Sequence, residues 1–183
     1  MKKIVVILST LLLFSLSASA EKYRFGGSLG YYAVSDSTYK NTYGSGNFMY
    51  GGFISYDLLK ILELRGEIGY FKDSGKMTLT KEKIEFSIIP LVMGARVKLA
   101  EIKNLKPYVG AGIDFYSFKE KARLGDTSDS TFGFHVEAGA YIGLLWRLYF
   151  DLNLRYVKAD AKPYDEEIRL GGLKTGIGVG LSF

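Results

Sequence analysis

Hydrophobic and polar residues alternate along the last segment of the chain, which runs from Leu173 to the terminal Phe183. Successive side chains of a β-strand point to opposite faces, so the odd-numbered residues of this segment share one apolar face. The even-numbered residues share the other face, which carries Lys174 and small residues. Because soluble antiparallel strands also alternate, the meaning of this pattern depends on whether it recurs.

The same two-residue period does recur, in windows that cover most of the chain. Most windows are close to the ~9–11 residues that a tilted strand needs to cross a bilayer. They span residues 23–33, 47–57, 62–71, about 84–99, 107–117, 131–143, 148–157 and about 170–183. The pattern predicts eight antiparallel strands.

In every window one face is free of charge and the charged residues lie on the opposite face. The charged-face residues are Arg24, Glu63, Arg65, Glu67, Arg96, Lys98, Asp114, His135, Glu137, Asp151, Arg155 and Lys174. An arginine or lysine turned toward lipid at the bilayer midplane would cost ~2–4 kcal/mol. We therefore expect the apolar faces to touch hydrocarbon and the charged faces to line the interior of a transmembrane barrel.

The alternation changes phase in the fourth window. The apolar residues Ile84, Phe86 and Ile88 are even-numbered, whereas those after Pro90 are odd-numbered. A one-residue β-bulge would restore the facing, and proline fits at a bulge because it cannot donate a ladder hydrogen bond. We predict such a bulge at Pro90.

The connections between windows alternate in length. Long polar segments at 34–46, 72–83, 118–130 and 158–169 alternate with short joins at 58–61, 100–106 and 144–147. Long outer loops and short periplasmic turns are typical of outer-membrane barrels, as are two aromatic girdles. We place Trp146, Tyr149, Tyr23 and Tyr108 in the inner girdle, and Tyr31, Tyr50, Tyr70 and Tyr156 in the outer one.

The start of the chain has the pattern of a secretory signal. Two lysines precede an apolar stretch, Ile4 to Phe14, and Ala18-Ser19-Ala20 forms a small-x-small cleavage pattern. The stretch is too short for a membrane-spanning helix, which needs about 20 residues. We predict a cleaved signal peptide at residues 1–20 and a barrel domain at 21–183, with an uncleaved anchor as the alternative.

Several short segments resemble the outer-membrane β-barrel domain family, which includes barrels similar to the OmpA membrane domain, OmpX and OmpW. They are Lys106-Pro107-Tyr108-Val109-Gly110-Ala111-Gly112-Ile113, Ile89-Pro90-Leu91, Phe132-Gly133-Phe134-His135, Leu154-Arg155-Tyr156 and the terminal Gly178-Val179-Gly180-Leu181-Ser182-Phe183. The resemblance implies an all-β, eight-stranded antiparallel up-and-down transmembrane barrel in the outer membrane of a Gram-negative-type bacterium. It also implies that the barrel-assembly machinery reads the C-terminal strand with Phe183. It implies no particular activity, because members of the family differ in function.

Composition excludes several kinds of site. The chain has no cysteine and a single histidine, which argues against disulfides, thiolate sites and transition-metal sites. Its net charge of +5 falls to +3 without Lys2 and Lys3, too little and too dispersed for nucleic-acid binding. No cofactor is expected.

The interior charges predict a closed lumen. An eight-stranded barrel has an interior that side chains can fill, and buried charges are tolerable when they are paired. The expected network consists of Arg65, Glu67, Arg96, Asp114, His135, Glu137, Asp151, Arg155 and Lys174. A structural or surface-interaction role follows. A narrow channel for small solutes is the alternative, because glycines such as Gly176 and Gly178 line one wall and either admit long side chains or leave a crevice.

His135 and Glu137 share the inward face, so a general base or a pH-sensitive group is conceivable there. We favour a hydrogen-bonded lumen histidine, since no hydroxyl nucleophile stands beside a base in any readable motif. In the known family of barrel lipid A deacylases, the histidine, serine and acid lie on the lipid-facing wall, whereas His135 faces inward. We predict that the protein is not an enzyme.

The remaining expectations concern partners and one rival fold. We expect a monomer in contact with outer-membrane lipid and with lipopolysaccharide, whose phosphates suit the lysines and arginines of the loops. An adhesin that binds a host or cell-surface ligand through these loops is a lesser alternative. A soluble lipocalin-like barrel would show the same period with inside and outside exchanged.

Overall fold

The computed structural model describes residues 22–76, 83–122, 125–144, 146–161 and 168–183. The predicted signal peptide at 1–20 lies outside these residues and stays a prediction. Within the described residues, no helix is both long enough and apolar enough to cross a membrane.

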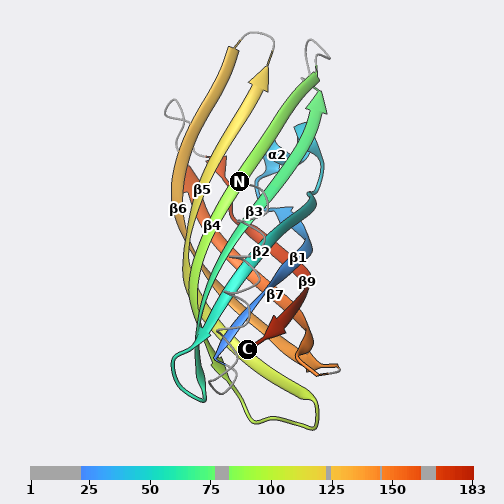
Figure 1. Ribbon diagram of the computed structural model, residues 1–183. Coiled ribbons are helices and arrows are strands. Elements are labelled where there is room, and N and C mark those ends of the chain that lie inside the picture. Colours follow the sequence, from blue (N-terminus) through green and yellow to red (C-terminus); the bar gives the residue numbers. More distant parts are fainter. Residues whose placement is uncertain (1–21, 77–82, 123–124, 145, 162–167) are drawn as a thin grey trace, which may run out of the picture.

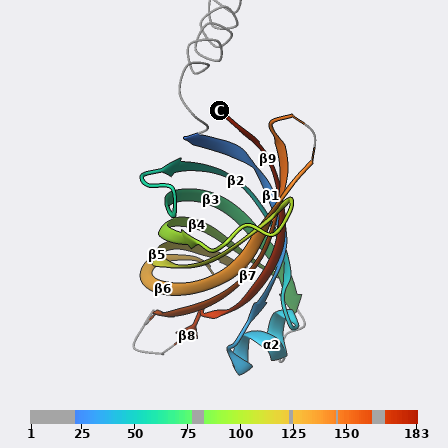
Figure 2. The ribbon, with the colours of Figure 1, turned by 90° about the horizontal axis from the view of Figure 1, so that it is seen from below.

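Antiparallel strands, each paired with its neighbours in sequence, form a closed barrel (Figures 1 and 2). The pairing of the first strand with the last closes the sheet, from Arg24 opposite Ser182 to Val34 opposite Gly172. The strands are β1 (Tyr23–Val34), β2 (Asn47–Asp57), β3 (Leu62–Lys76), β4 (Lys83–Lys98), β5 (Leu105–Ala122), β6 (Gly125–Gly143), β7 (Leu148–Ala161) and β9 (Gly172–Ser182). The predicted eight-stranded up-and-down barrel is confirmed.

The closing strand has a short continuation, β8 (Ile168–Arg169). It pairs with β7 in the register that β9 also uses, since Asp160 lies opposite Arg169 and Val157 lies opposite Gly172. Between β8 and β9, the Leu170 carbonyl turns inward and accepts a hydrogen bond from the Tyr32 hydroxyl. The last strand is therefore one ribbon with an interruption.

The two ends of the barrel differ. At the short-turn end, residues 58–61, 99–104 and 144–147 connect strand pairs; at the hairpin end, β3, β5, β6 and β7 run beyond the predicted windows (Figure 1). The predicted loop at 118–130 is wrong in extent, because β5 and β6 stay paired up to Ala122 opposite Gly125. Parts of the predicted loops at 72–83 and 158–169 are also strand. The apolar alternation stops earlier, because strands beyond the membrane need no apolar outer face.

The predicted loop at 34–46 contains a helix, α2 (Ser37–Tyr43), which the sequence pattern did not indicate. Asp36 caps its start, with the carboxylate accepting a hydrogen bond of 2.8 Å from the Tyr39 amide. Gly44 ends it with a φ of 98°, a conformation that glycine adopts without steric cost. Seven residues are too few to display a helical hydrophobic period.

The predicted bulge at Pro90 is wrong. Pairing of β4 with β5 runs without a shift from Glu85 opposite Lys121 to Lys98 opposite Tyr108. The even-numbered residues of β4 face inward throughout, including buried Ile84, Phe86 and Ile88. The apparent change of phase arose because the interior itself becomes apolar toward the hairpin end.

Large apolar side chains cover the outside of the barrel, as the alternation predicted. They include Leu64, Ile68, Met93, Ile113, Leu154 and Ile177, all exposed. Tyr23 and Trp146 point outward at the short-turn end, but the girdle assignment of Tyr108 and Tyr149 is wrong. Both lie on the inward parity of their strands and are buried in the lumen, where the Tyr108 hydroxyl donates to Asp151 at 2.6 Å.

Candidate functional site

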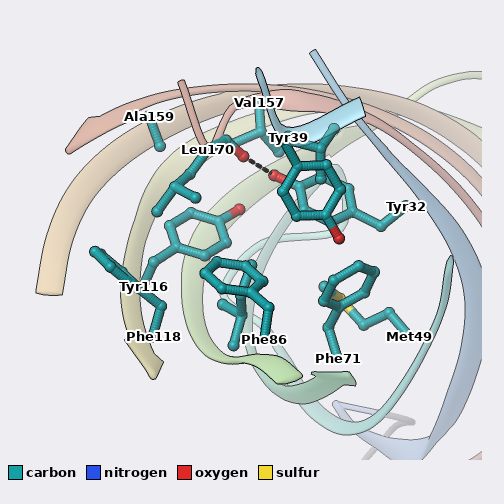
Figure 3. Close-up of a cluster of buried hydrophobic side chains, with 12 residues drawn as sticks. Tyr32, Tyr39, Met49, Phe71, Phe86, Tyr116, Phe118, Val157, Ala159 and Leu170 are labelled. Atoms are coloured by element: carbon teal, nitrogen blue, oxygen red, sulfur yellow. Dashed lines mark hydrogen bonds between the residues drawn. The ribbon is translucent and has the colours of Figure 1, made fainter. Parts of the chain in front are cut away.

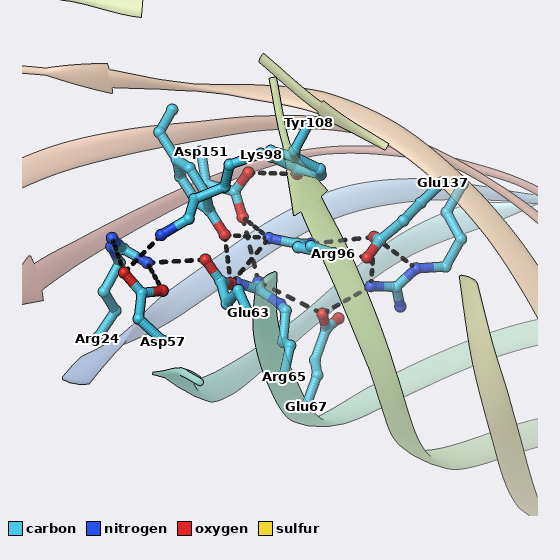
Figure 4. Close-up of polar contacts among 12 residues, drawn as sticks. Arg24, Asp57, Glu63, Arg65, Glu67, Arg96, Lys98, Tyr108, Glu137 and Asp151 are labelled. Carbon is cyan, nitrogen blue, oxygen red and sulfur yellow. Dashed lines mark hydrogen bonds and ion pairs between the residues drawn. The ribbon is translucent and has the colours of Figure 1, made fainter. Parts of the chain in front are cut away.

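The barrel interior is the candidate site, and its charged part begins at the short-turn end (Figure 4). Arg24 of β1 makes a two-pronged ion pair with Asp57 of β2, at 2.8 and 2.9 Å. It also reaches Glu63 of β3 at 2.7 Å, while Lys98 of β4 binds Asp57 from the other side at 2.5 Å. This layer ties four neighbouring strands together.

Arg96 of β4 is the centre of the next layer. Its Nε and Nη2 donate to Glu137 of β6 at 2.7 and 3.0 Å, a two-pronged geometry that suits a guanidinium and a carboxylate. Its Nη1 lies 3.2 Å from Asp151 of β7 and donates to the Tyr141 hydroxyl at 2.6 Å. Tyr141 donates in turn to Glu63 at 2.6 Å, which joins this layer to the one below.

A third layer lies farther along the axis. Arg155 of β7 bridges Glu137 at 3.0 Å and Glu67 at 3.1 Å. Lys174 of β9 donates to the other oxygen of Glu67. Arg65 lies 3.2 Å from Asp151, with its guanidinium 3.8 Å from the centre of the Phe53 ring. The three layers thus form one connected network across the lumen.

Most of the residues expected to pair inside the barrel lie in this network. Asp114 and His135 are the exception, because they form a separate buried pair, with Nδ1 of His135 2.9 Å from the carboxylate. Asp57 and Tyr141 were missed as members. Asp57 lies on the same inward face of β2 as Phe53 and Ser55. The alternation along this strand would therefore have placed it in the lumen.

The buried charges balance. Between the short-turn end and the apolar interior, and with the half-buried Asp57 and Lys98 included, the cations are Arg24, Arg65, Arg96, Lys98, Arg155 and Lys174, and the carboxylates, equal in number, are Asp57, Glu63, Glu67, Asp114, Glu137 and Asp151. Asp73, also buried, lies apart from them toward the hairpin end. Removing charges from water is costly unless partners and hydrogen bonds replace the solvent, and most of these groups have several partners. The arrangement suits mutual neutralisation.

Inward-facing glycines make room for rings from the strands beside them. A Cβ on Gly180 would lie 2.7 Å from the Tyr149 hydroxyl, and one on Gly139 would lie 2.4 Å from the Tyr108 hydroxyl. These distances are well below van der Waals contact. At these positions each glycine leaves room for the ring of the residue directly opposite on the neighbouring strand.

Toward the hairpin end the interior is filled by an apolar plug (Figure 3). Its members, all buried, are Tyr32, Val34, Tyr39, Met49, Phe71, Phe86, Ile88, Tyr116, Phe118, Val157, Ala159 and Leu170. Phe71 meets Tyr32 edge-on at 5.8 Å, and Phe86 lies 6.0 Å from Phe118, both in the range of favourable ring pairs. The expected lumen of charges alone is therefore incomplete.

Helix α2 covers the plug at the hairpin end. Tyr39 and Tyr43 each lie 5.6 Å from the Phe86 ring. The Tyr39 hydroxyl donates to Asp73 at 2.9 Å, and the Tyr43 hydroxyl donates to Glu120 at 3.0 Å. Burial, followed by the hydrogen bond to Asp73, raises the pKa of Tyr39 above its ordinary value, so the phenol keeps its proton. Polar bonds at the rim thus hold the helix in place.

Among the described residues, no group of three or more histidines and acids is arranged to hold a metal ion. His135 and Asp114 are each 1% exposed, so a substrate in solution does not reach the pair.

Comparisons with known proteins agree with this architecture. A model of the outer membrane protein β-barrel domain matches residues 6–183. The structure of Neisserial surface protein A (NspA) is similar with a TM-score of 0.70 at 14% identity, over 88% of this chain and 97% of that chain. OprG from Pseudomonas aeruginosa also gives a TM-score of 0.70 at 14% identity, over 90% of this chain and 96% of that one.

A third similar structure is Ail, the attachment invasion locus protein of Yersinia pestis. Its TM-score is 0.52 at 15% identity, over 88% of this chain and 100% of that one. Ail has also been solved in complex with sucrose octasulfate, a heparin analogue. The comparison with curated protein sequences gave no significant match.

Proposed function

Because this chain belongs to the outer membrane protein β-barrel domain family, we propose that it is a closed barrel which acts through its surface rather than by conducting solutes. The chain is an outer-membrane protein. Since outer-membrane barrels have long outer loops and short periplasmic turns, the hairpin end is assigned to the cell exterior and the short-turn end to the periplasm.

The observation that carries this proposal is the double obstruction of the lumen. Glu63, Arg96 and Asp151 in the charged network have no solvent-exposed surface. Phe71 and Leu170 in the apolar plug have none either. A water molecule reaches none of these five side chains, and a conducting path would have to displace both levels.

Conductance across a planar bilayer tests this proposal. The wild-type protein is expected to give no steady openings, because either the charged network or the apolar plug alone would close the lumen. The combined variant Arg96→Ala, Glu137→Ala, Phe71→Ala and Phe86→Ala is expected to conduct. Lys158→Gln, at an exposed position on β7, is the control and should stay silent.

The opposite result would support the narrow-channel alternative. Steady openings of the wild-type protein that Arg155→Ala or Glu137→Ala changes would show that ions pass the network. The plug would then have to be mobile.

A contact role on the cell surface is favoured by the hairpin of β5 and β6. Its ladder continues beyond Phe115 opposite Phe132, the last large apolar pair on the outer face, to Ala122 opposite Gly125. These added pairs do nothing to seal the membrane. The similarity to Ail, named for attachment and invasion and solved with a heparin analogue, is consistent with such a role.

Shortening this hairpin tests the contact role. Replacing residues 120–127 by Asn-Gly joins Lys119 to Ser128, which pair across the hairpin, through a two-residue turn. Bacteria that display the variant are expected to bind target cells and heparin-coated beads less than bacteria that display wild type. Equal binding at equal surface amounts would remove the adhesin alternative, and Lys158→Gln is the control.

The remaining expectations complete the proposal. The barrel-assembly machinery would read Phe183, which stacks on Phe25 at 5.3 Å and closes the ladder beside Tyr23. We also expect the protein to be a monomer, to contact lipopolysaccharide and to have no catalytic residue. The burial of the His135–Asp114 pair supports the non-enzymatic role.

A further inference from the structure

The three turns of the short-turn end share a composition that a water-facing turn does not need. Lys60 follows Leu58 and Leu59, Lys103 follows Ile102, and Arg147 follows Trp146. The apolar members are exposed, and Trp146 is 91% exposed. Each turn thus presents large apolar side chains next to a cation.

The strand ends and the three turns line two adjoining cavities. One has a volume of about 240 Å³ and is lined by Arg24, Lys106 and Arg147. The other has a volume of about 480 Å³ and is lined by Lys60 and Lys98 together with Arg24 and Lys106. The cavities therefore share two of their cations.

The cavities are positively charged overall, because their cations outnumber the carboxylates Asp57 and Glu101. Asp57 forms ion pairs with Arg24 and Lys98, and Glu101 forms one with Lys106 at 3.4 Å. Both carboxylates are therefore already paired.

The other two cations that line these cavities are Lys60 and Arg147. Within the described part of the chain, neither has a carboxylate within ion-pair distance. The Arg147 guanidinium instead lies over rings, 5.5 Å from Trp146 and 4.9 Å from Phe183.

Trp146 has a φ of 57°, in the left-handed region that bulky residues rarely adopt. Such a conformation persists only where the surrounding structure fixes it. Here it holds an indole beside Arg147, on the rim that continues the apolar outer belt through Leu148.

We propose that this end of the barrel binds the phosphate headgroup of an anionic phospholipid. Arginine matches phosphate geometry, and the apolar rim beside it offers a surface to acyl chains. A soluble anion would use the cations but not the rim, which is continuous with the lipid-facing belt. The assignment of this site to the periplasmic leaflet rests on the orientation proposed above, but the lipid site itself does not.

The single tryptophan of the chain, Trp146, reports directly on this site. The full mature protein is refolded into phosphatidylcholine vesicles that contain an equal minor fraction of either brominated phosphatidylglycerol or brominated phosphatidylcholine. Stronger quenching of Trp146 by the brominated phosphatidylglycerol is expected, and salt should weaken the difference. Equal quenching by the two lipids would overturn the proposal.

Variants identify the cations responsible. Arg147→Gln and Lys60→Gln are each expected to reduce the preference for the anionic lipid about fivefold, the usual effect of one cation near a charged membrane surface. Lys158→Gln, at the opposite end, should leave it unchanged. If a variant does not fold, the comparison of the two brominated lipids with wild-type protein still decides.

A last arm separates a lipid from a free anion. Inorganic phosphate added to phosphatidylcholine vesicles should not change the Trp146 emission, and an equal response would overturn assignment to a lipid. The vesicle result does not depend on insertion direction or on conductance. Failure of the lipid site is therefore distinguishable from failure of the closed-barrel proposal.

Discussion

Replacing Arg96 by methionine is expected to lower the free energy of unfolding by about 3–5 kcal/mol, the usual cost of removing one partner from a buried ion pair. Arg96 has no exposed surface and binds Glu137 through two nitrogens. It also supports Asp151 and the hydroxyl of Tyr141. Methionine fills much of the volume but donates no hydrogen bond, so Glu137 keeps only Arg155 as a cationic partner and Asp151 keeps only Arg65.

The measurement is urea unfolding of the refolded protein in lipid vesicles, followed by heat-dependent mobility on a gel. The double variant Arg96→Met, Glu137→Gln should be less destabilised than the sum of the two single variants, since it removes the Glu137 carboxylate together with the guanidinium that neutralised it. Lys158→Met is the exposed control. Wild-type stability of Arg96→Met would mean that the network does not hold the barrel together.

Replacing Phe71 by alanine is expected to cost ~3–5 kcal/mol, because it opens a cavity in the apolar plug. Phe71 is fully buried and meets the Tyr32 ring edge-on. The neighbouring side chains belong to a closed barrel wall and to α2, so they can collapse into the gap only in part.

Phe132→Ala is the matched control for this experiment. Phe132 is 71% exposed on the outer face of β6, where lipid fills the space that its ring leaves. The same unfolding assay should show a much smaller loss for Phe132→Ala than for Phe71→Ala. Similar losses would indicate that the plug is loosely packed.

Much of the barrel could be read from the chain because lipid imposes a strict rule. Charges are excluded from outward positions at membrane depth, so a period of two residues marked the strands and assigned Arg65, Arg96 and Arg155 to the interior. Parity alone also placed Tyr108 and Tyr149 inside, and their assignment to a girdle ignored it.

The interior obeys a weaker rule, and there the prediction was incomplete. A buried position accepts either a paired charge or an apolar group, so Ile84, Phe86 and Ile88 were taken for outward residues. The error produced a bulge at Pro90 that does not exist. The short helix α2 was missed because its seven residues contain no periodic signal.

The sequence by itself determined the number of strands and the inward or outward facing of most residues, because these depend on local alternation against a uniform hydrocarbon solvent; the outer membrane followed from the resemblance of its segments to a known family. Only the tertiary structure decided which cation meets which carboxylate and that an apolar plug covers the charged network. Those contacts join residues far apart in sequence, such as Lys174 and Glu67, and depend on register and closure across the lumen.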